Sequence, residues 1–137
     1  MSRSRSRSPS PTSGGSSREH IMAAPDREVL RNLLEQWRSN EINEREVHEE
    51  AERLLDEHGW IEYPENDDRS VAMEVLSQLA ILNRQLVTRE DIPAMLGFLN
   101  TPPGETSKGW NTWRRYWNSI DYEKRREELK QNPYYST

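Results

Sequence analysis

His48 and the carboxylates that follow it are the residues of this chain whose types could do metal chemistry. The run from His48 to Glu52 reads HEEAE, and a helix presents its first and last residues on one face. A catalytic zinc takes three protein ligands, but this run has no second histidine, and His58 is turned to another face. We therefore predict no metal site here and place His48 on a charged, solvated helix face near the edge of the core.

Paired carboxylates could also hold a divalent cation. Glu49 and Glu52 form one such pair, which resembles half of the magnesium site of all-helical nucleotide pyrophosphohydrolases. The second pair is missing, because Glu74 is followed three residues later by Ser77. The acidic loop at residues 65–68 lacks the glycine and the distal glutamate of a calcium loop. Neither pattern predicts a metal site.

Other catalytic classes lack their residues. The chain has no cysteine and only three histidines, and no serine stands at a strand-to-helix elbow. No glycine-rich loop follows a strand to hold a phosphate. We predict no catalytic, cofactor-binding or metal-ligating residue and hence no enzyme. A metal-dependent hydrolase stays as the least favoured alternative.

An aromatic stripe is the most unusual local feature, and it comprises Trp110, Trp113, Tyr116 and Trp117. Helical spacing puts its three tryptophans on one face, beside two arginines. Such a face could stack the bases of single-stranded nucleic acid or form a protein-binding hot spot. The other interpretation is that the stripe closes the core, which helical spacing favours. The sequence leaves both interpretations, a binding face and a core face, open.

The elements that position these residues are predicted to be helices, because large apolar side chains recur at spacings of three and four. The clearest beginning is at Asn43, which can form a capping box with Glu46; Gly59 is typical of a left-handed C-cap. Thr88 with Asp91 makes a second capping arrangement, although Pro93 favours a start at Asp91. The predicted ranges are 26–39, 43–59, 70–85, 91–100, 107–119 and 121–131.

These helices predict an all-α fold, an antiparallel helical bundle of about five to six short helices. The buried face of the first helix is expected to include Val29, Leu30, Leu33, Leu34 and Trp37. The third helix is the most apolar and is expected to be central, whereas the last is highly charged and expected to be mostly exposed. The only candidate strand is at residues 60–63.

The first 25 residues differ in composition from the rest of the 137-residue chain. They are rich in Ser and Arg, which predicts a disordered tail ahead of a helical domain over residues 26–137. The tail is either a short Arg-Ser domain or sequence that is not native, with the start at Met22. No stretch approaches the roughly 18 apolar residues of a membrane span, so we expect a cytoplasmic protein that does not contact membranes.

Charge is divided unevenly. Residues 1–22 carry four arginines and one glutamate, a net charge of +3, so the remainder of a chain at −5 carries −8. A negative body suits a basic protein partner and makes nucleic acid an unfavourable one. The candidate partner-binding residues are the carboxylates expected to be exposed: Glu49, Glu52, Asp56, Glu65, Asp67 and Asp68. The sequence predicts no oligomeric state.

Several strings resemble a small bacterial family of helical proteins, mostly hypothetical: Ile42–His48, Thr88–Pro93, Phe98–Gly104 and Gly109–Trp117. The first of these is also similar to a string in bacterial immunity proteins that neutralise colicin-like or contact-dependent toxins. This resemblance implies a non-enzymatic inhibitor of a basic toxin. Our first interpretation is a protein-binding helical module of immunity or regulatory type. The alternative is an RNA-associated protein that uses the Arg-Ser tail and the aromatic stripe.

Overall fold

The computed structural model describes residues 25–132 together with 134 and 135. These residues form seven α-helices and one 3-10 helix and no strand, so the prediction of an all-helical chain is confirmed and residues 60–63 are not a strand. The predictions for residues 1–24, the tail and the start at Met22, lie outside the described residues. The elements are α2 (Arg27–Arg38), α3 (Glu44–His58), α4 (Arg69–Ala80), α5 (Leu82–Gln85), η2 (Arg89–Asp91), α6 (Ile92–Leu99), α7 (Thr106–Asn118) and α8 (Tyr122–Leu129).

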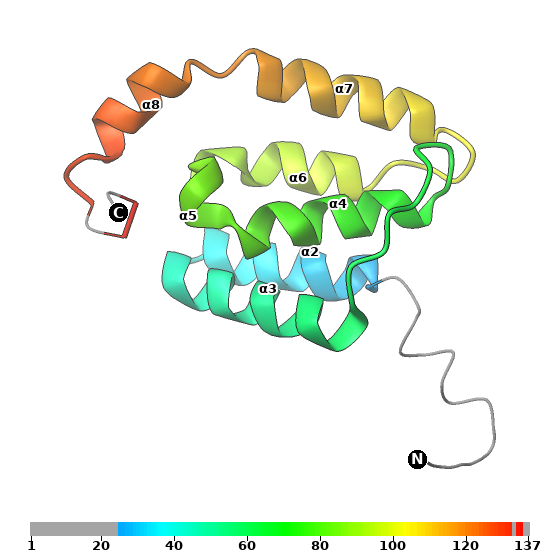
Figure 1. Ribbon diagram of the computed structural model, residues 1–137, viewed down its shortest axis with the longest axis horizontal. Coiled ribbons are helices and arrows are strands. Elements are labelled where there is room, and N and C mark those ends of the chain that lie inside the picture. Colours follow the sequence, from blue (N-terminus) through cyan, green and yellow to red (C-terminus); the bar gives the residue numbers. More distant parts are fainter. Residues whose placement is uncertain (1–24, 133, 136–137) are drawn as a thin grey trace, which may run out of the picture.

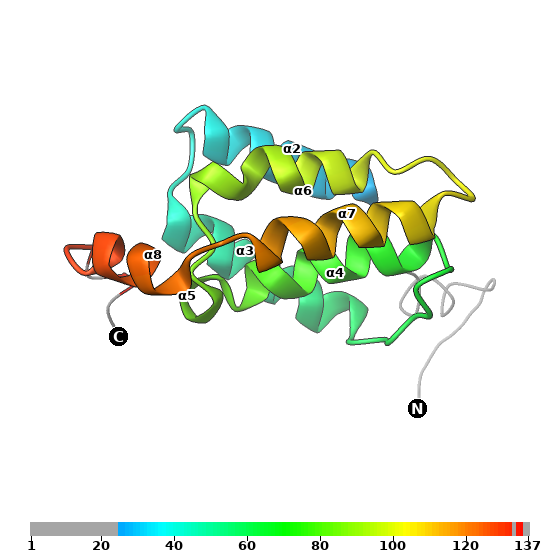
Figure 2. The same ribbon diagram turned by 90° about the horizontal axis from the view of Figure 1, so that it is seen from above.

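The long helices pass back and forth between two ends of the molecule (Figure 1). Helix α3 packs on α2 and α4, and α6 contacts α2, α4 and α7. Seen from above, α7 lies over α4 and α6, and α8 continues beyond its end (Figure 2). Helix α8 therefore lies at one end of the molecule.

Local capping determines where two elements begin. The Asn43 side chain accepts from the Glu46 N–H at 2.9 Å, and Glu46 accepts from the Asn43 N–H at 2.9 Å. Thr88 and Asp91 form the second capping box, but at the start of the 3-10 turn η2 rather than of an α-helix. Helix α6 follows with Pro93 in its first turn, where the missing N–H costs nothing. Both predicted capping boxes are confirmed.

The predicted continuous helix over residues 70–85 is wrong, because it breaks at Ile81. Ile81 has φ −124° and ψ 34°, and it separates α4 from α5. The preceding carbonyl, that of Ala80, accepts a hydrogen bond at 2.9 Å from Nε2 of His48 on α3. Helix α5 then ends at Leu86, which has a left-handed φ of 55°. A left-handed conformation costs a leucine about 1–2 kcal/mol, so the packing around Leu86 must stabilise it.

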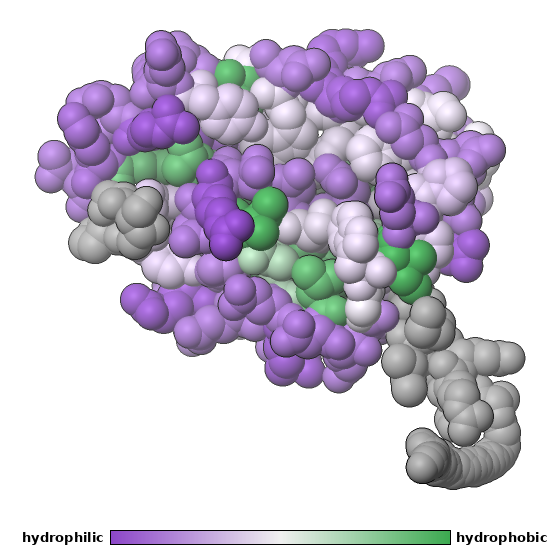
Figure 3. All heavy atoms as spheres, in the orientation of Figure 1, coloured by the Kyte–Doolittle hydropathy of each residue, from purple (hydrophilic) through white to green (hydrophobic). Residues whose placement is uncertain are grey.

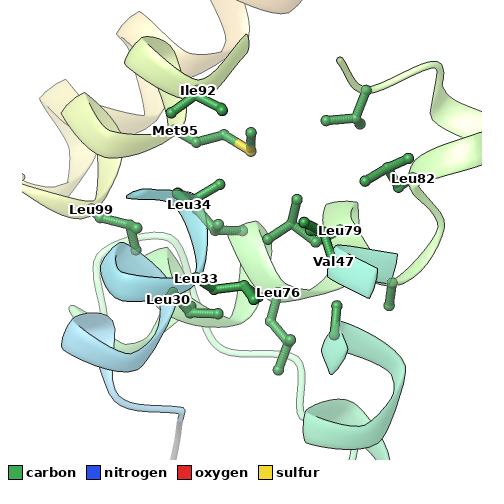
Figure 4. Packing of buried hydrophobic residues seen from close by; sticks show 14 of the residues in the cluster. Leu30, Leu33, Leu34, Val47, Leu76, Leu79, Leu82, Ile92, Met95 and Leu99 are labelled. Carbon is green, nitrogen blue, oxygen red and sulfur yellow. The ribbon is translucent and has the colours of Figure 1, made fainter. Parts of the chain in front are cut away.

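The core collects side chains from α2 to α7, and α4 contributes the most to it. Figure 4 shows leucines of α2 facing those of α4, with Ile92 and Met95 of α6 above them and Leu99 of α6 to the left. Complete burial of one such side chain contributes roughly 1.5–3 kcal/mol. The prediction for Val29 is wrong: its side chain is 44% exposed, whereas Leu30, Leu33, Leu34 and Trp37 are buried. Val29 lies at the rim of an open pocket between α2 and α3, beside Glu46 and Glu50, and this position leaves it exposed.

Helices α6 and α7 approach closely at one glycine. A Cβ built on Gly109 of α7 would lie 2.5 Å from Oγ1 of Thr101, which is buried after the end of α6. The same end of α6 is bound from the other side by Arg27, whose Nη1 donates to the carbonyls of Leu99 and Thr101 at 2.9 and 2.8 Å. These contacts determine how the aromatic stripe of α7 meets the core.

Candidate functional site

The side chain of His48 makes contacts that belong to the fold. Its Nε2 lies 2.9 Å from the carbonyl oxygen of Ala80, and its Nδ1 contacts the hydroxyl of Tyr134. Because a carbonyl only accepts, Nε2 carries the proton and the Tyr134 hydroxyl can donate to Nδ1. Glu52 lies 3.5 Å from Nε2. His48 thus connects α3, the end of α4 and the C-terminal segment.

The carboxylate of Glu74 is bonded to the indole of Trp113. Its Oε2 accepts from Nε1 of Trp113 at 3.0 Å and from Nε2 of Gln78 at 3.3 Å. A two-helix magnesium site would need a carboxylate from α4. Glu74, the carboxylate in that position, is instead bonded to Trp113 of α7. Within the described range of the chain, no three His, Cys, Asp or Glu side chains are grouped so that they could hold a metal ion.

The three predicted carboxylates of α3 share one exposed face. Glu49, Glu52 and Asp56 stand at spacings of three and four and are all exposed. Glu52 is the one that lies near His48, whereas Glu49 and Asp56 form no ion pair with any described residue. The side chains bring together three negative charges that the fold leaves almost unneutralised.

The three predicted loop carboxylates are instead bound within the molecule. Glu65 accepts from Nη1 of Arg114 at 2.5 Å, and Asp67 pairs with Arg69 at 2.7 Å. Asp68 accepts from the hydroxyl of Thr106, at the start of α7. The contacts of Glu65 and Asp68 hold the loop against α7. The six predicted contact residues therefore divide into an open set on α3 and an engaged set in the loop.

The aromatic stripe of α7 is partly core and partly surface. Trp113 is buried and stacks on Phe98, with ring centroids 4.5 Å apart. Trp110, Tyr116 and Trp117 are half-buried around it, with Trp110 and Trp117 packed against the core. Each alternative from the sequence therefore describes part of the stripe, and no row of open rings is available for stacking bases.

A buried ionic cluster escaped the sequence analysis. Asp91 is completely buried, and its carboxylate accepts from Nη1 and Nη2 of Arg125 at 2.8 and 3.0 Å. It also accepts from the Thr88 N–H at 2.8 Å and from the Tyr116 hydroxyl. Arg125 donates further to the carbonyl of Leu86 at 3.1 Å. The last helix is mostly exposed, as predicted, but Arg125 departs from this and is only 8% exposed.

The environment of this cluster shifts two pKa values. Burial, and then the hydrogen bond to Asp91, raise the pKa of Tyr116 to about 12. Burial by itself would lower the pKa of Arg125, but its bonds and charge interaction with Asp91 outweigh burial and raise it. Asp91 therefore joins η2, α7 and α8 through a charge that stays paired. Tyr122, Arg125 and Leu129, spaced by three and four, form the inward stripe that signals this burial.

Two tyrosines near the C-terminus were also missed. Tyr135 is buried and donates to the carbonyl of Val87 at 2.6 Å. Tyr134 contacts His48 and lies 5.5 Å from the guanidinium of Arg45. Burial raises the pKa of both hydroxyls. The adjacent Tyr-Tyr pair, in a segment otherwise polar, is the only signal in the sequence that could have indicated this docking.

The described residues contain no helix long and apolar enough to cross a membrane. A comparison of the chain with family models, with curated proteins and with solved structures finds no match in any of the three. The candidate functional site therefore depends on the residues of this chain alone, and it is the exposed carboxylate face of α3, defined by Glu49, Glu52 and Asp56.

Proposed function

We propose that this chain is a non-enzymatic protein-binding module, an antiparallel helical bundle that binds a basic protein as an immunity, inhibitor or regulatory protein would. The observation that carries the proposal is the carboxylate face of α3. Its three side chains are exposed on one side of a helix, and two of them form no ion pair with a described residue. Unpaired surface charge of one sign attracts a partner of the opposite sign and suppresses wrong partners.

The charge of the whole chain supports the same partner class. Beyond residue 22 the chain carries a net charge of −8, and such a field speeds the encounter with a positively charged protein. The effect weakens with salt, because the Debye length falls to about 8 Å at physiological ionic strength. The association rate with the partner should therefore fall as salt is added.

The test is affinity capture on the full-length chain at low and high salt, followed by calorimetry with each purified captured protein. We expect saturable binding of a protein rich in Lys and Arg. The variant Glu49→Lys/Glu52→Lys/Asp56→Lys should abolish it. A matched control, Glu41→Lys/Glu127→Lys/Glu128→Lys, makes the same change of charge at exposed positions elsewhere and should keep most of the affinity.

Two results would overturn the proposal. One is that no basic protein binds saturably, and the other is that both charge variants bind it equally well. Filter binding to single-stranded RNA provides the rival outcome. A salt-sensitive RNA affinity that ignores the α3 variant and disappears when Arg3, Arg5, Arg7 and Arg18 become Gln would establish the RNA-associated alternative instead.

A further inference from the structure

Trp60 is the most exposed large apolar side chain of the described residues. Its side chain is 58% exposed, and Val29 is the other member of this class. Trp60 lies in the segment between α3 and α4, which crosses the face seen in Figure 1. The space-filling view of that face shows apolar and weakly polar residues gathered between purple, hydrophilic margins (Figure 3). An exposed indole on such a face is typical of a binding hot spot.

The indole borders a pocket that combines aromatic rings with carboxylates. Three aromatic side chains line it, Trp60, Tyr63 and Trp110, and three carboxylates accompany them, Glu62, Glu65 and Glu74. No Lys or Arg is among the lining residues that the structure describes. Rings and carboxylates together form a site for a cation, because the face of an aromatic ring is negative.

The protein's own arginines already use this chemistry at two of the three rings. The guanidinium carbon of Arg69 lies 4.6 Å from the centroid of the Tyr63 ring. That of Arg114 lies 5.7 Å from the Trp110 ring, and its Nη1 is 2.5 Å from Glu65. In the part of the chain that the structure describes, no cation lies over the Trp60 ring.

Acceptors are also free beside Trp60. Glu62 is exposed and pairs with no described cation. Glu74 uses only Oε2 for its bonds to Trp113 and Gln78, which leaves Oε1 without a described donor. The hydroxyl of Tyr63 is buried and has no hydrogen-bond partner among the described residues. The pocket thus offers one open ring and two carboxylate acceptors.

We propose that this pocket binds an arginine side chain of the basic partner, with its guanidinium on the Trp60 ring and its N–H groups donating to Glu62 and Glu74. The proposal rests on the proposed function, since it names the anchor through which the same partner is held. Arginine fits better than lysine because its planar fork stacks on a ring and donates to carboxylates at the same time. Both cations already seated on the neighbouring rings are arginines.

The test uses full-length, ¹⁵N-labelled protein and the probe peptide acetyl-Gly-Arg-Gly-Arg-Gly-amide. The indole N–H signal of Trp60 is assigned by its loss in Trp60→Phe. We expect the peptide to shift this signal saturably, and Trp60→Ala to weaken binding about three- to fivefold, as the loss of an exposed cation–π contact would. A lysine peptide should bind more weakly, and a citrulline peptide, which is neutral, should leave the signal in place.

Val29→Ala is the matched control, because it removes the other exposed apolar side chain, and it should leave the affinity unchanged. Equal affinity of Trp60→Ala and the wild type, with melting curves showing both folded, would overturn the proposal. So would a shift of the Trp60 signal on changing Arg3, Arg5, Arg7 and Arg18 to Gln without peptide, because this chain's own basic segment would then be the occupant.

The two proposals fail separately. If the purified basic partner loses affinity for the α3 lysine variant but binds Trp60→Ala as well as the wild type, the proposed function stands and the arginine pocket is wrong. If Trp60→Ala weakens that partner and the α3 variant does not, the pocket stands and the carboxylate face of α3 is not the binding surface.

Discussion

Asp91 and the carboxylate face of α3 show two opposite uses of negative charge in one small chain. Asp91 is completely buried and is bound by Arg125, Thr88 and Tyr116. Glu49 and Asp56 are exposed and form no ion pair with a described residue. A buried carboxylate must keep its partners, since an uncompensated buried charge is strongly destabilising. An exposed one is solvated and contributes little to folding.

This difference separates residues that hold the fold from residues that are free for a partner. Helix α8 lies at the end of the molecule (Figure 1), and its buried Arg125 is the residue that ties it to Asp91 and to the carbonyl of Leu86. Glu49, Glu52 and Asp56 of α3 connect no two helices among the described residues. Substitutions in the first group should therefore change stability, whereas substitutions in the second should change binding.

Asp91→Ala has the largest expected effect. Removing one partner of a buried ion pair typically costs 3–5 kcal/mol, and the free energy of unfolding should fall by about that amount. Denaturant unfolding followed by circular dichroism measures it. Asp67→Ala is the control, because it removes an ion pair with the exposed Arg69 and should cost less than about 1 kcal/mol. Equal losses of unfolding free energy in the two variants would contradict the difference between the buried Asp91 and the more exposed carboxylates.

Tyr116→Phe should have the next largest effect on stability. It removes the hydroxyl that donates to Asp91 but keeps the ring that packs on Trp117. A hydrogen bond to a charged group contributes about 1.5–3 kcal/mol, and we expect a loss in that range by denaturant unfolding. In the Asp91→Ala background the same substitution should cost much less. Additive losses would show that the two residues do not interact.

Alkaline pH should weaken the same cluster. The pKa of Tyr116 is raised from 10.0 to about 12, so the unfolded chain releases this proton at lower pH than the folded chain does. Its contribution to stability is complete below pH 10 and is lost as the pH rises from 10 to 12. Melting temperatures across this interval should fall less steeply in Tyr116→Phe than in the wild type. Identical slopes would count against a buried Tyr116 hydroxyl.

Tyr134→Phe should have a smaller effect, because Tyr134 is half-buried and its hydroxyl contacts the ring of His48 rather than a carboxylate. A neutral hydrogen bond contributes about 0.5–1.5 kcal/mol net. Hydrogen exchange at the N–H groups of α5 should rise in this variant, since His48 also holds the carbonyl of Ala80 at the break before α5. Unchanged hydrogen exchange in α5 would show that the contact of Tyr134 with His48 does not affect the break between α4 and α5.

The smallest effect on stability is expected for Glu49→Gln/Glu52→Gln/Asp56→Asn. Exposed substitutions usually change the free energy of unfolding by no more than about 0.5 kcal/mol each, and here like charges on one helix face are removed as well. The same variant should bind a basic partner more weakly and with less dependence on salt. An unfolding free energy that falls by more than about 2 kcal/mol would assign this face to the fold instead.

The sequence by itself determined the elements whose causes are local. Asn43 and Glu46, three residues apart, predict the start of α3, and Thr88 with Asp91 predicts the second capping box. Such contacts depend only on helix geometry, which fixes what lies three or four residues away. The same periodicity predicted Leu30 and Trp37 in the core and the three exposed carboxylates of α3.

Only the tertiary structure decided the features that join distant residues. The break at Ile81 accompanies a bond from His48, thirty-two positions from Ala80 in the sequence. The burial of Arg125 requires Asp91, thirty-four positions away, and the arginine pocket requires Trp110 of α7 beside Trp60. The physical reason is that a side chain's exposure and partners depend on which helices pack against it, and spacing along a single helix does not contain that information.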